Sequence, residues 1–155
     1  MKRYLSLGLV FVAVLFLMTG CVEKNIDGTL EEIMTKLYTD LAEDKTPMGL
    51  TNIELTDDNI ENYIGTKEID YTEAMASESM TGSIAHSVVL IRVEDVSKME
   101  KYKEEILEKV NPRKWICVGI EKEEVIIENK GNLLMVLIVQ DEDNRNIIAE
   151  AFNNL

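Results

Sequence analysis

Two stretches in the first half of the chain repeat apolar residues at the spacing of an α-helix. In residues 29–41 the apolar positions share one helical face, and Thr29 with Glu32 forms a capping-box pattern at the start. Residues 56–65 contain a shorter apolar stripe that ends at Gly65, a residue suited to a helix C-cap. The pattern therefore predicts two amino-terminal helices.

After residue 68 short apolar and β-branched runs replace the helical spacing. Residues 69–75 and 87–93 are predicted to be two strands that pair as a hairpin, followed by an amphipathic helix over 97–110. Residues 125–139 are predicted to form a second hairpin around a glycine turn. A final helix is expected over 141–155, capped by an aspartate.

These elements predict an α+β fold. Two strand-strand-helix units make a four-stranded, mainly antiparallel sheet with helices on one face, preceded by the two amino-terminal helices. The runs 88–93 and 133–139 lack polar alternation, so they are expected to be the central strands. The similar order of residues in 88–95 and 135–142 suggests an internal duplication.

The amino terminus has the pattern of an export signal. Lys2 and Arg3 are followed by an apolar run over residues 4–18, which is short for a membrane span. The next residues complete the run Leu17-Met18-Thr19-Gly20-Cys21, which resembles a bacterial lipobox. In lipoproteins that share this motif the cysteine thiol receives a diacylglycerol, and palmitate is a usual acyl group.

The resemblance to a lipobox implies three parts in the chain. Residues 1–20 are expected to be a lipoprotein signal peptide, 21–28 a lipidated tether, and 29–155 a single domain. Cys21 is then the lipidation site that holds the protein at the extracytoplasmic face of the cell membrane. An uncleaved signal anchor is the alternative. A helix of the globular core fits less well, because the apolar run has no polar face.

The chain is strongly acidic, with 29 acidic and 16 basic residues and a formal net charge of -13. Loss of Lys2 and Arg3 with the leader would make the domain still more acidic. Such a charge repels nucleic acid and anionic lipid headgroups. We therefore expect no nucleic-acid partner, and membrane attachment only through the lipid on Cys21.

The domain as a whole resembles the small lipoproteins of Gram-positive anaerobes that share one carboxy-terminal domain of unknown function. The resemblance rests on the segment 55–65, on the hairpin and helix over 85–110, and on the turn Lys130-Gly131-Asn132 before an apolar strand. It implies no catalytic, cofactor-binding or metal-binding residue, since none is established for that family.

The residues offer little chemistry for catalysis. His86 is the only histidine, and it lies near Ser83 and beside Ser87. Adjacent residues of a strand point to opposite faces, so His86 and Ser87 are not expected to act together, and His86 is interpreted as a polar residue near a hairpin turn. Phosphate-loop, nucleophile-elbow and paired-histidine metal motifs are missing from the sequence. We expect no cofactor.

Acidic groups are the remaining candidates for a site. Asp57, Asp58, Glu73 and Glu78 are the carboxylates that a glycosidase-like reaction would use. Three acidic clusters could attract a hard cation: 57–58, 121–124 and 141–144. The last one lacks the spacing of a calcium loop, and its position is explained by a helix cap.

Two further residues have alternative interpretations. Cys117 is either a reactive thiol or, as its apolar neighbours favour, a small buried hydrophobe. Trp115 is either a core residue or part of an interaction surface, and core packing is favoured. The surrounding segment 113–122 has no decisive pattern and is compatible with a strand or a helical turn.

Three classes of function follow from these observations. The favoured hypothesis is a non-enzymatic, lipid-anchored module that binds a protein or another component of the cell envelope. The alternatives are a carboxylate-based envelope enzyme or its accessory subunit, and a receptor for a small molecule or ion.

Overall fold

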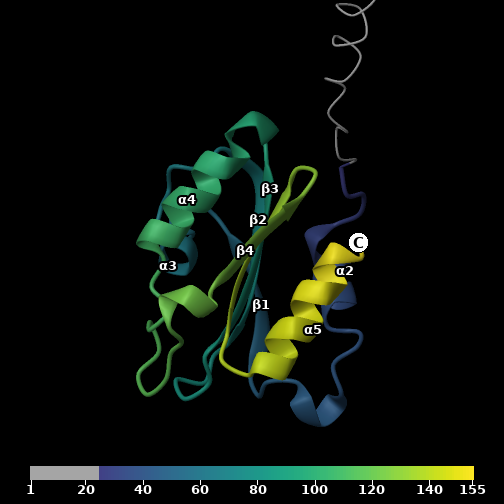
Figure 1. The fold of residues 1–155 in the computed structure, drawn as a ribbon, viewed down its shortest axis with the longest axis vertical. Coiled ribbons are helices and arrows are strands. Elements are labelled where there is room, and N and C mark those ends of the chain that lie inside the picture. Colours follow the sequence, from purple (N-terminus) through teal and green to yellow (C-terminus); the bar gives the residue numbers. More distant parts are fainter. Residues whose placement is uncertain (1–24) are drawn as a thin grey trace, which may run out of the picture.

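Five antiparallel strands form one open sheet in the computed structural model, which describes residues 25–155 (Figure 1). The strand order is β1-β2-β3-β5-β4. The strands and helices, in chain order, are α2 (Leu30–Leu37), β1 (Leu50–Leu55), α3 (Glu61–Ile64), β2 (Tyr71–Ser79), β3 (His86–Val93), α4 (Met99–Lys109), β4 (Ile126–Lys130), β5 (Leu133–Val139) and α5 (Glu142–Asn153). Short 3₁₀ helices cover Glu43–Lys45, Val96–Lys98 and Lys122–Glu124. The predicted α+β class is confirmed.

The two apolar strands lie at the centre, as their sequences predict. β3 and β5 pair from His86 opposite Val139 to Arg92 opposite Leu133. Every side chain of β5 is buried, including those on alternate positions that face opposite sides of the sheet. A strand of this kind needs a packed layer on each face.

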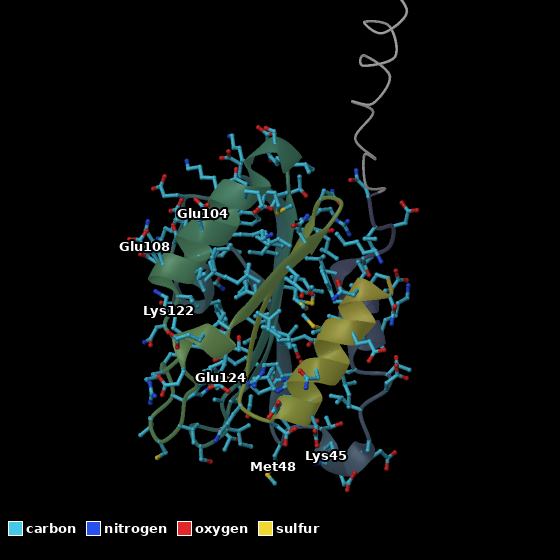
Figure 2. All side chains as sticks on the ribbon, viewed as in Figure 1. Lys45, Met48, Glu104, Glu108, Lys122 and Glu124 are labelled. Atoms are coloured by element: carbon cyan, nitrogen blue, oxygen red, sulfur yellow. The ribbon has the colours of Figure 1, made fainter. Side chains whose placement is uncertain are left out.

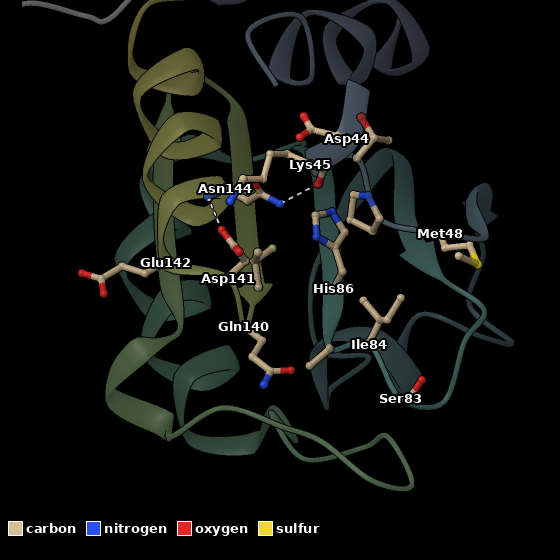
Figure 3. Close-up of a pocket in the computed structure, with 14 residues that line it drawn as sticks. Asp44, Lys45, Met48, Ser83, Ile84, His86, Gln140, Asp141, Glu142 and Asn144 are labelled. Carbon is tan, nitrogen blue, oxygen red and sulfur yellow. Dashed lines mark hydrogen bonds between the residues drawn. The ribbon is translucent and has the colours of Figure 1, made fainter. Parts of the chain in front are cut away.

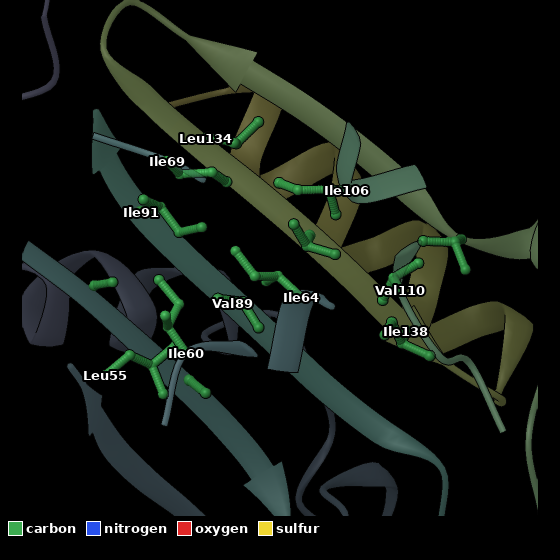
Figure 4. Close-up of a cluster of buried hydrophobic side chains, with 14 of the residues drawn as sticks. Leu55, Ile60, Ile64, Ile69, Val89, Ile91, Ile106, Val110, Leu134 and Ile138 are labelled. Atoms are coloured by element: carbon green, nitrogen blue, oxygen red, sulfur yellow. The ribbon is translucent and has the colours of Figure 1, made fainter. Parts of the chain in front are cut away.

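Helices provide both layers. α3 and α4 cover one face, and α2 and α5 cover the other (Figure 1). Figure 4 shows the first core, in which Ile64 and Ile106 from the helices meet Val89 and Ile91 of β3. In the second core Leu37 and Phe152 of α2 and α5 pack with the opposite side of β3 and β5. We call these the α4 face and the α5 face.

The predicted sheet is wrong in two respects. It has five strands rather than four, because Leu50–Leu55 forms the edge strand β1. Most side chains of β1 are only partly buried or exposed, so its sequence lacks the apolar run that identified the other strands. Helices also cover both faces instead of one, since β3 and β5 are apolar on both sides.

The second predicted helix is shorter than expected and lies after β1, so it does not precede the sheet. It is the single turn α3, which ends at Gly65 with a φ of 81°. A Cβ atom at Gly65 would lie 2.3 Å from the backbone oxygen of Lys109. Glycine is therefore required here both by the left-handed backbone and by close contact with the end of α4.

Three local signals are confirmed. Thr29 and Glu32 form a reciprocal capping box at the start of α2. Asp141 caps α5 by accepting a hydrogen bond from the backbone of Asn144. Gly131 has a φ of 55° in the turn between β4 and β5.

Both strand-strand-helix units are present, as β2-β3-α4 and β4-β5-α5, but their helices lie on opposite faces. A two-fold axis that relates the antiparallel neighbours β3 and β5 would stand perpendicular to the sheet and place both helices on one face. The structure therefore does not have the symmetry that a simple duplication predicts.

The predicted signal peptide over 1–20, the predicted lipidation site Cys21 and the first part of the predicted tether lie outside the described residues. Among residues 25–155, no helix combines the length and apolar character needed to cross a membrane.

Candidate functional site

A groove of about 740 Å³ opens where β3 begins and β5 ends (Figure 3). Its walls come from the loop before β1 (44–48), the segment before and including the start of β3 (83–86), and the junction of β5 with α5 (139–144). The volume falls within the range usual for ligand-binding pockets. These segments lie at the lower end of the molecule in Figure 1, opposite the end where residue 25 lies.

His86 forms part of the groove and is almost fully buried. Its Nε2 lies 2.8 Å from the hydroxyl of Tyr38, at the C-terminal end of α2. Burial lowers the pKa of His86 from 6.5 to about 4 and raises the pKa of Tyr38. Both side chains are therefore neutral near pH 7. The interpretation of His86 as a polar residue near a hairpin turn is confirmed, since it is the first residue of β3 after the turn from β2, but its burial was not predicted.

A second groove of about 520 Å³ is lined by Tyr38 and lies between α2 and the edge strand β1. It shares Thr46 with the first groove and includes Ser77 of β2. Ser77 is fully buried, and its Oγ makes no hydrogen bond within the described residues. The Ser77 hydroxyl lies near Tyr38 and partly offsets the rise in the Tyr38 pKa, although the geometry is not that of a hydrogen bond.

Asn144 contributes a second buried group with unused hydrogen-bonding capacity. It is 4% exposed and lines the first groove. Its Nδ2 donates to the backbone oxygen of Lys45 at 2.9 Å, as Figure 3 shows, but its Oδ1 has no partner within the described residues. An unpaired buried acceptor costs roughly 1–3 kcal/mol unless something outside the chain hydrogen-bonds to it.

The α4 face has a different polar cluster at the same end of the sheet. The Lys114 ammonium donates to Glu78, and both side chains are largely buried, at 17% and 15% exposure. The same ammonium lies 4.5 Å from the centre of the Tyr63 ring and 5.1 Å from that of Trp115. Burial lowers the pKa of Lys114, and the bond to Glu78 partly offsets this change. The charges of Lys114 and Glu78 therefore neutralise each other inside the protein.

Three neighbouring loops at the groove end expose large apolar side chains. Met48, Met80 and Ile116 are 77%, 68% and 91% exposed. The loops are joined by backbone hydrogen bonds from Met80 to Gly49 and from Cys117 to Gly82. Figure 2 shows Met48 extending from this end of the molecule. We call the segments 44–49, 80–85 and 113–121 the distal loops.

The four candidate carboxylates do not meet in one site. Asp57 accepts a hydrogen bond from the Tyr71 hydroxyl at 2.9 Å. Glu73 pairs with Arg92 on the α5 face, whereas Glu78 pairs with Lys114 on the α4 face. Glu73 and Glu78 are five positions apart in β2, which corresponds to about 16 Å at the rise of a strand. That separation exceeds the spacing of a glycosidase pair. Asp58 is exposed beside Asp57.

The other acidic clusters have structural roles. Asp141 caps α5, which confirms that interpretation. Glu121 pairs with Arg113, and Glu124 lies 3.1 Å from Arg145. Within residues 25–155 no three His, Cys, Asp or Glu side chains are arranged so that they could hold a metal ion.

The outcomes for Trp115 and Cys117 differ. Trp115 packs in the core of the α4 face, which confirms the favoured interpretation. Cys117 is exposed, so the prediction that it is a buried hydrophobe is wrong. The segment 113–121 is an irregular loop followed by a 3₁₀ helix, and it turns Trp115 inward while Ile116 and Cys117 face solvent.

Sequence reasoning did not identify Tyr38, Ser77 or Asn144 as members of a site. Asn144 was included only as part of an acidic helix cap. A weak signal was available for Ser77, because a serine in an otherwise buried strand position is a polar group that must find a partner. The contact of Tyr38 with His86, 48 residues away, arises only from the tertiary fold.

Comparisons with family models, with curated proteins and with solved structures each found no match for this chain.

Proposed function

We propose that this protein is a lipid-anchored, extracytoplasmic binding module of the cell envelope, without enzymatic activity, whose distal loops and groove contact a partner. The lipid on Cys21 is its attachment to the membrane. The proposal is supported by the distance between two ends of the domain: the end that holds residues 26–28, and the end that holds the groove and the distal loops.

Arg92 defines the end nearest the anchor. Its guanidinium donates to the backbone oxygens of Ile26 and Gly28 at 2.7 and 2.8 Å. Cys21 precedes Ile26 by five residues in the sequence, so a lipid on Cys21 would keep this end within about 17 Å of the bilayer surface. His86, in the groove, lies at the other end of β3, about 20 Å from Arg92 at the rise of a strand. A lipid anchor would therefore leave the groove facing away from the membrane.

Photo-cross-linking in intact cells tests the binding function. A photoreactive amino acid is placed at Ile116 in the distal loops, and at Val96, an exposed apolar residue between β3 and α4, as the matched control. We expect a discrete adduct from Ile116 and none from Val96. Equal adducts from both positions, or none from either, would contradict the proposal.

The anchor has its own test. Labelling of cells with a palmitate analogue should mark the wild-type protein and not the Cys21→Ala variant, which should also fail to stay with the membrane fraction as a mature chain. Label that persists in Cys21→Ala would exclude the anchor, whatever the cross-linking shows.

A second candidate is a receptor for a small molecule, and the groove with the unpaired Oδ1 of Asn144 favours it over an enzyme. A ligand present at about 100 times its dissociation constant adds roughly 2.7 kcal/mol of stability. A thermal-shift screen of envelope metabolites would detect such a ligand, and its loss in Asn144→Ala would assign it to the groove.

A further inference from the structure

Within residues 25–155, Asn144 Oδ1 receives no hydrogen bond, whereas the side-chain and backbone nitrogens of Asn144 each donate one. Its Nδ2 donates to the Lys45 oxygen, and its backbone nitrogen donates to Asp141, both at 2.9 Å. Rotation of the amide would place Oδ1 against the Lys45 oxygen, where two acceptors would repel each other. The donor that Oδ1 lacks can be supplied by an ordered water or by a polar group of a bound molecule.

The charges around the groove favour a cation. Asp44, Asp141 and Glu142 line it, and Lys45 is the one basic residue in its lining. Figure 3 shows the Asp141 carboxylate beside Asn144, while Glu142 points away. The chain as a whole carries a formal charge of -13. An anion is repelled from such a site, and a positively charged hydrogen-bond donor is attracted to it.

The rest of the lining suits a short hydrocarbon stem. Pro47, Ile84, Ala85 and Val139 contribute apolar surface close to Asn144 and His86. An aliphatic chain can pack against these side chains while its charged end reaches the acceptors, as lysine side chains do at protein surfaces.

We propose that the groove binds a primary ammonium group carried on an aliphatic stem, with Asn144 Oδ1 and the Asp141 carboxylate as its acceptors. A lysine side chain of a partner protein and a free polyamine offer the same chemistry. The proposal rests on the proposed binding function and names the ligand of that site.

Titration of the ¹⁵N-labelled full chain in a neutral detergent, followed by NMR, tests the ligand class. The probes are Nα-acetyl-lysine amide and putrescine, each compared with the analogue in which hydroxyl replaces ammonium. We expect both amines to shift the resonances of Asn144, Ala85 and Gln140, and the hydroxyl analogues to bind about tenfold more weakly. Tighter binding of the lysine probe points to a protein lysine as the source, and tighter binding of putrescine to a polyamine.

Four variants assign the interaction to named atoms. Asn144→Ala should weaken amine binding about tenfold. Asp141→Asn keeps the helix cap and removes a charge, so binding should weaken about threefold, whereas Lys45→Gln removes the like charge and should strengthen it by about the same factor. Asn153→Ala is the matched control on the same helix, since its amide contacts Glu128 outside the groove, and it should not change binding.

A gain of affinity in Lys45→Gln cannot result from misfolding, so the set remains decisive even if Asn144→Ala is unstable. Equal binding of amines and hydroxyl analogues would overturn the proposal, as would shifts scattered over the acidic surface or variants without effect. The photo-cross-linking at Ile116 does not depend on this ligand, so failure of the ammonium proposal and failure of the binding function can be told apart.

Discussion

The two faces of the sheet bury polar groups differently at the same end of β2 and β3. On the α4 face, Glu78 and Lys114 carry opposite charges that pair inside the protein. On the α5 face, Ser77 and His86 are neutral, and Ser77 has no partner within the described residues. Ser77 and Glu78 are adjacent in β2 and face opposite sides of the sheet. Glu78 is paired with Lys114 inside the protein, whereas Ser77 lies beside an open groove.

This difference teaches that buried polarity alone does not mark a binding site. The Glu78–Lys114 pair is an internal structural contact, because each charge is neutralised by the other. Ser87, opposite Glu78 in the β2–β3 register, also lacks a partner among residues 25–155, but it lines neither groove described above. In the described part of the chain, the α4 face has an unused donor, Trp115 Nε1, beside a smaller pocket, so the α5 face differs in offering an unused acceptor, Asn144 Oδ1.

Breaking the ion pair should produce the largest effect. Glu78→Leu leaves the largely buried Lys114 ammonium without its carboxylate, and we expect a loss of about 3 kcal/mol in the free energy of unfolding. The double variant Glu78→Leu/Lys114→Met removes both charges and should recover most of that loss. Urea denaturation of the three proteins measures both values. A single variant as stable as wild type would mean that solvent screens the pair.

Acid should destabilise the α5 face through His86. Above pH 6.5 the imidazole is neutral in the folded and unfolded chains alike. Between pH 6.5 and about 4 only the unfolded chain takes up the proton, so the free energy of unfolding falls by up to about 3 kcal/mol, with no further loss from this group below that range.

His86→Gln isolates this contribution. Carboxylates whose pKa is lowered in the folded protein, such as Asp70 beside Lys98, also cause stability to fall with acid, and they do so in both proteins. Denaturation of wild type and variant across the same pH range should show a shallower decline for His86→Gln. Parallel curves would show that His86 is readily protonated in the folded state.

Two serines of β2 differ in whether their hydroxyl makes a hydrogen bond within the protein. Ser79 donates to the Met48 oxygen at 2.9 Å, so Ser79→Ala should lose about 1 kcal/mol. Ser77 has no such bond, and Ser77→Ala should be neutral or slightly stabilising. Thermal unfolding of the two variants and the wild type measures both changes in stability. A larger loss in Ser77→Ala than in Ser79→Ala would show that the Ser77 hydroxyl has a structural partner.

Cys117 should give the smallest effect. Because the thiol is exposed in a distal loop, a thiol reagent should react with the folded protein nearly as fast as with the urea-unfolded protein, measured in a Cys21→Ala background. Cys117→Ser should change the free energy of unfolding by less than about 0.5 kcal/mol. Strong protection of the thiol in the folded state would instead place it in the core.

Much of the fold was predictable because its signals are local. The capping box of α2, the aspartate cap of α5 and the turn at Gly131 depend on residues a few positions apart. The edge strand β1 was missed because a partly exposed strand has no distinctive run of apolar residues. The apolar character of β3 and β5 on both sides already required two covering layers, a consequence that the one-face prediction did not follow through.

The site was less predictable than the fold. His86 was noticed because it is the only histidine, and its place near the β2–β3 turn was predicted, but its burial and its contact with Tyr38 were not. Tyr38, Ser77 and Asn144 come from α2, β2 and α5, and each has an ordinary local explanation as a helix end, a strand residue or a cap. Their convergence around two grooves depends on long-range packing, which no local pattern encodes.

The α+β class, the central strands and the approximate ranges of α2, α4 and α5 follow from the amino-acid sequence alone, because helix capping and apolar periodicity act over a few residues. It also supplies the pattern on which the proposed anchor at Cys21 rests. The face that each helix covers, the exposure of Cys117, and the acceptor of Asn144 that has no partner within residues 25–155 became apparent only in three dimensions. Burial and hydrogen-bond satisfaction depend on surfaces that come together from distant parts of the chain, so no local pattern reveals them.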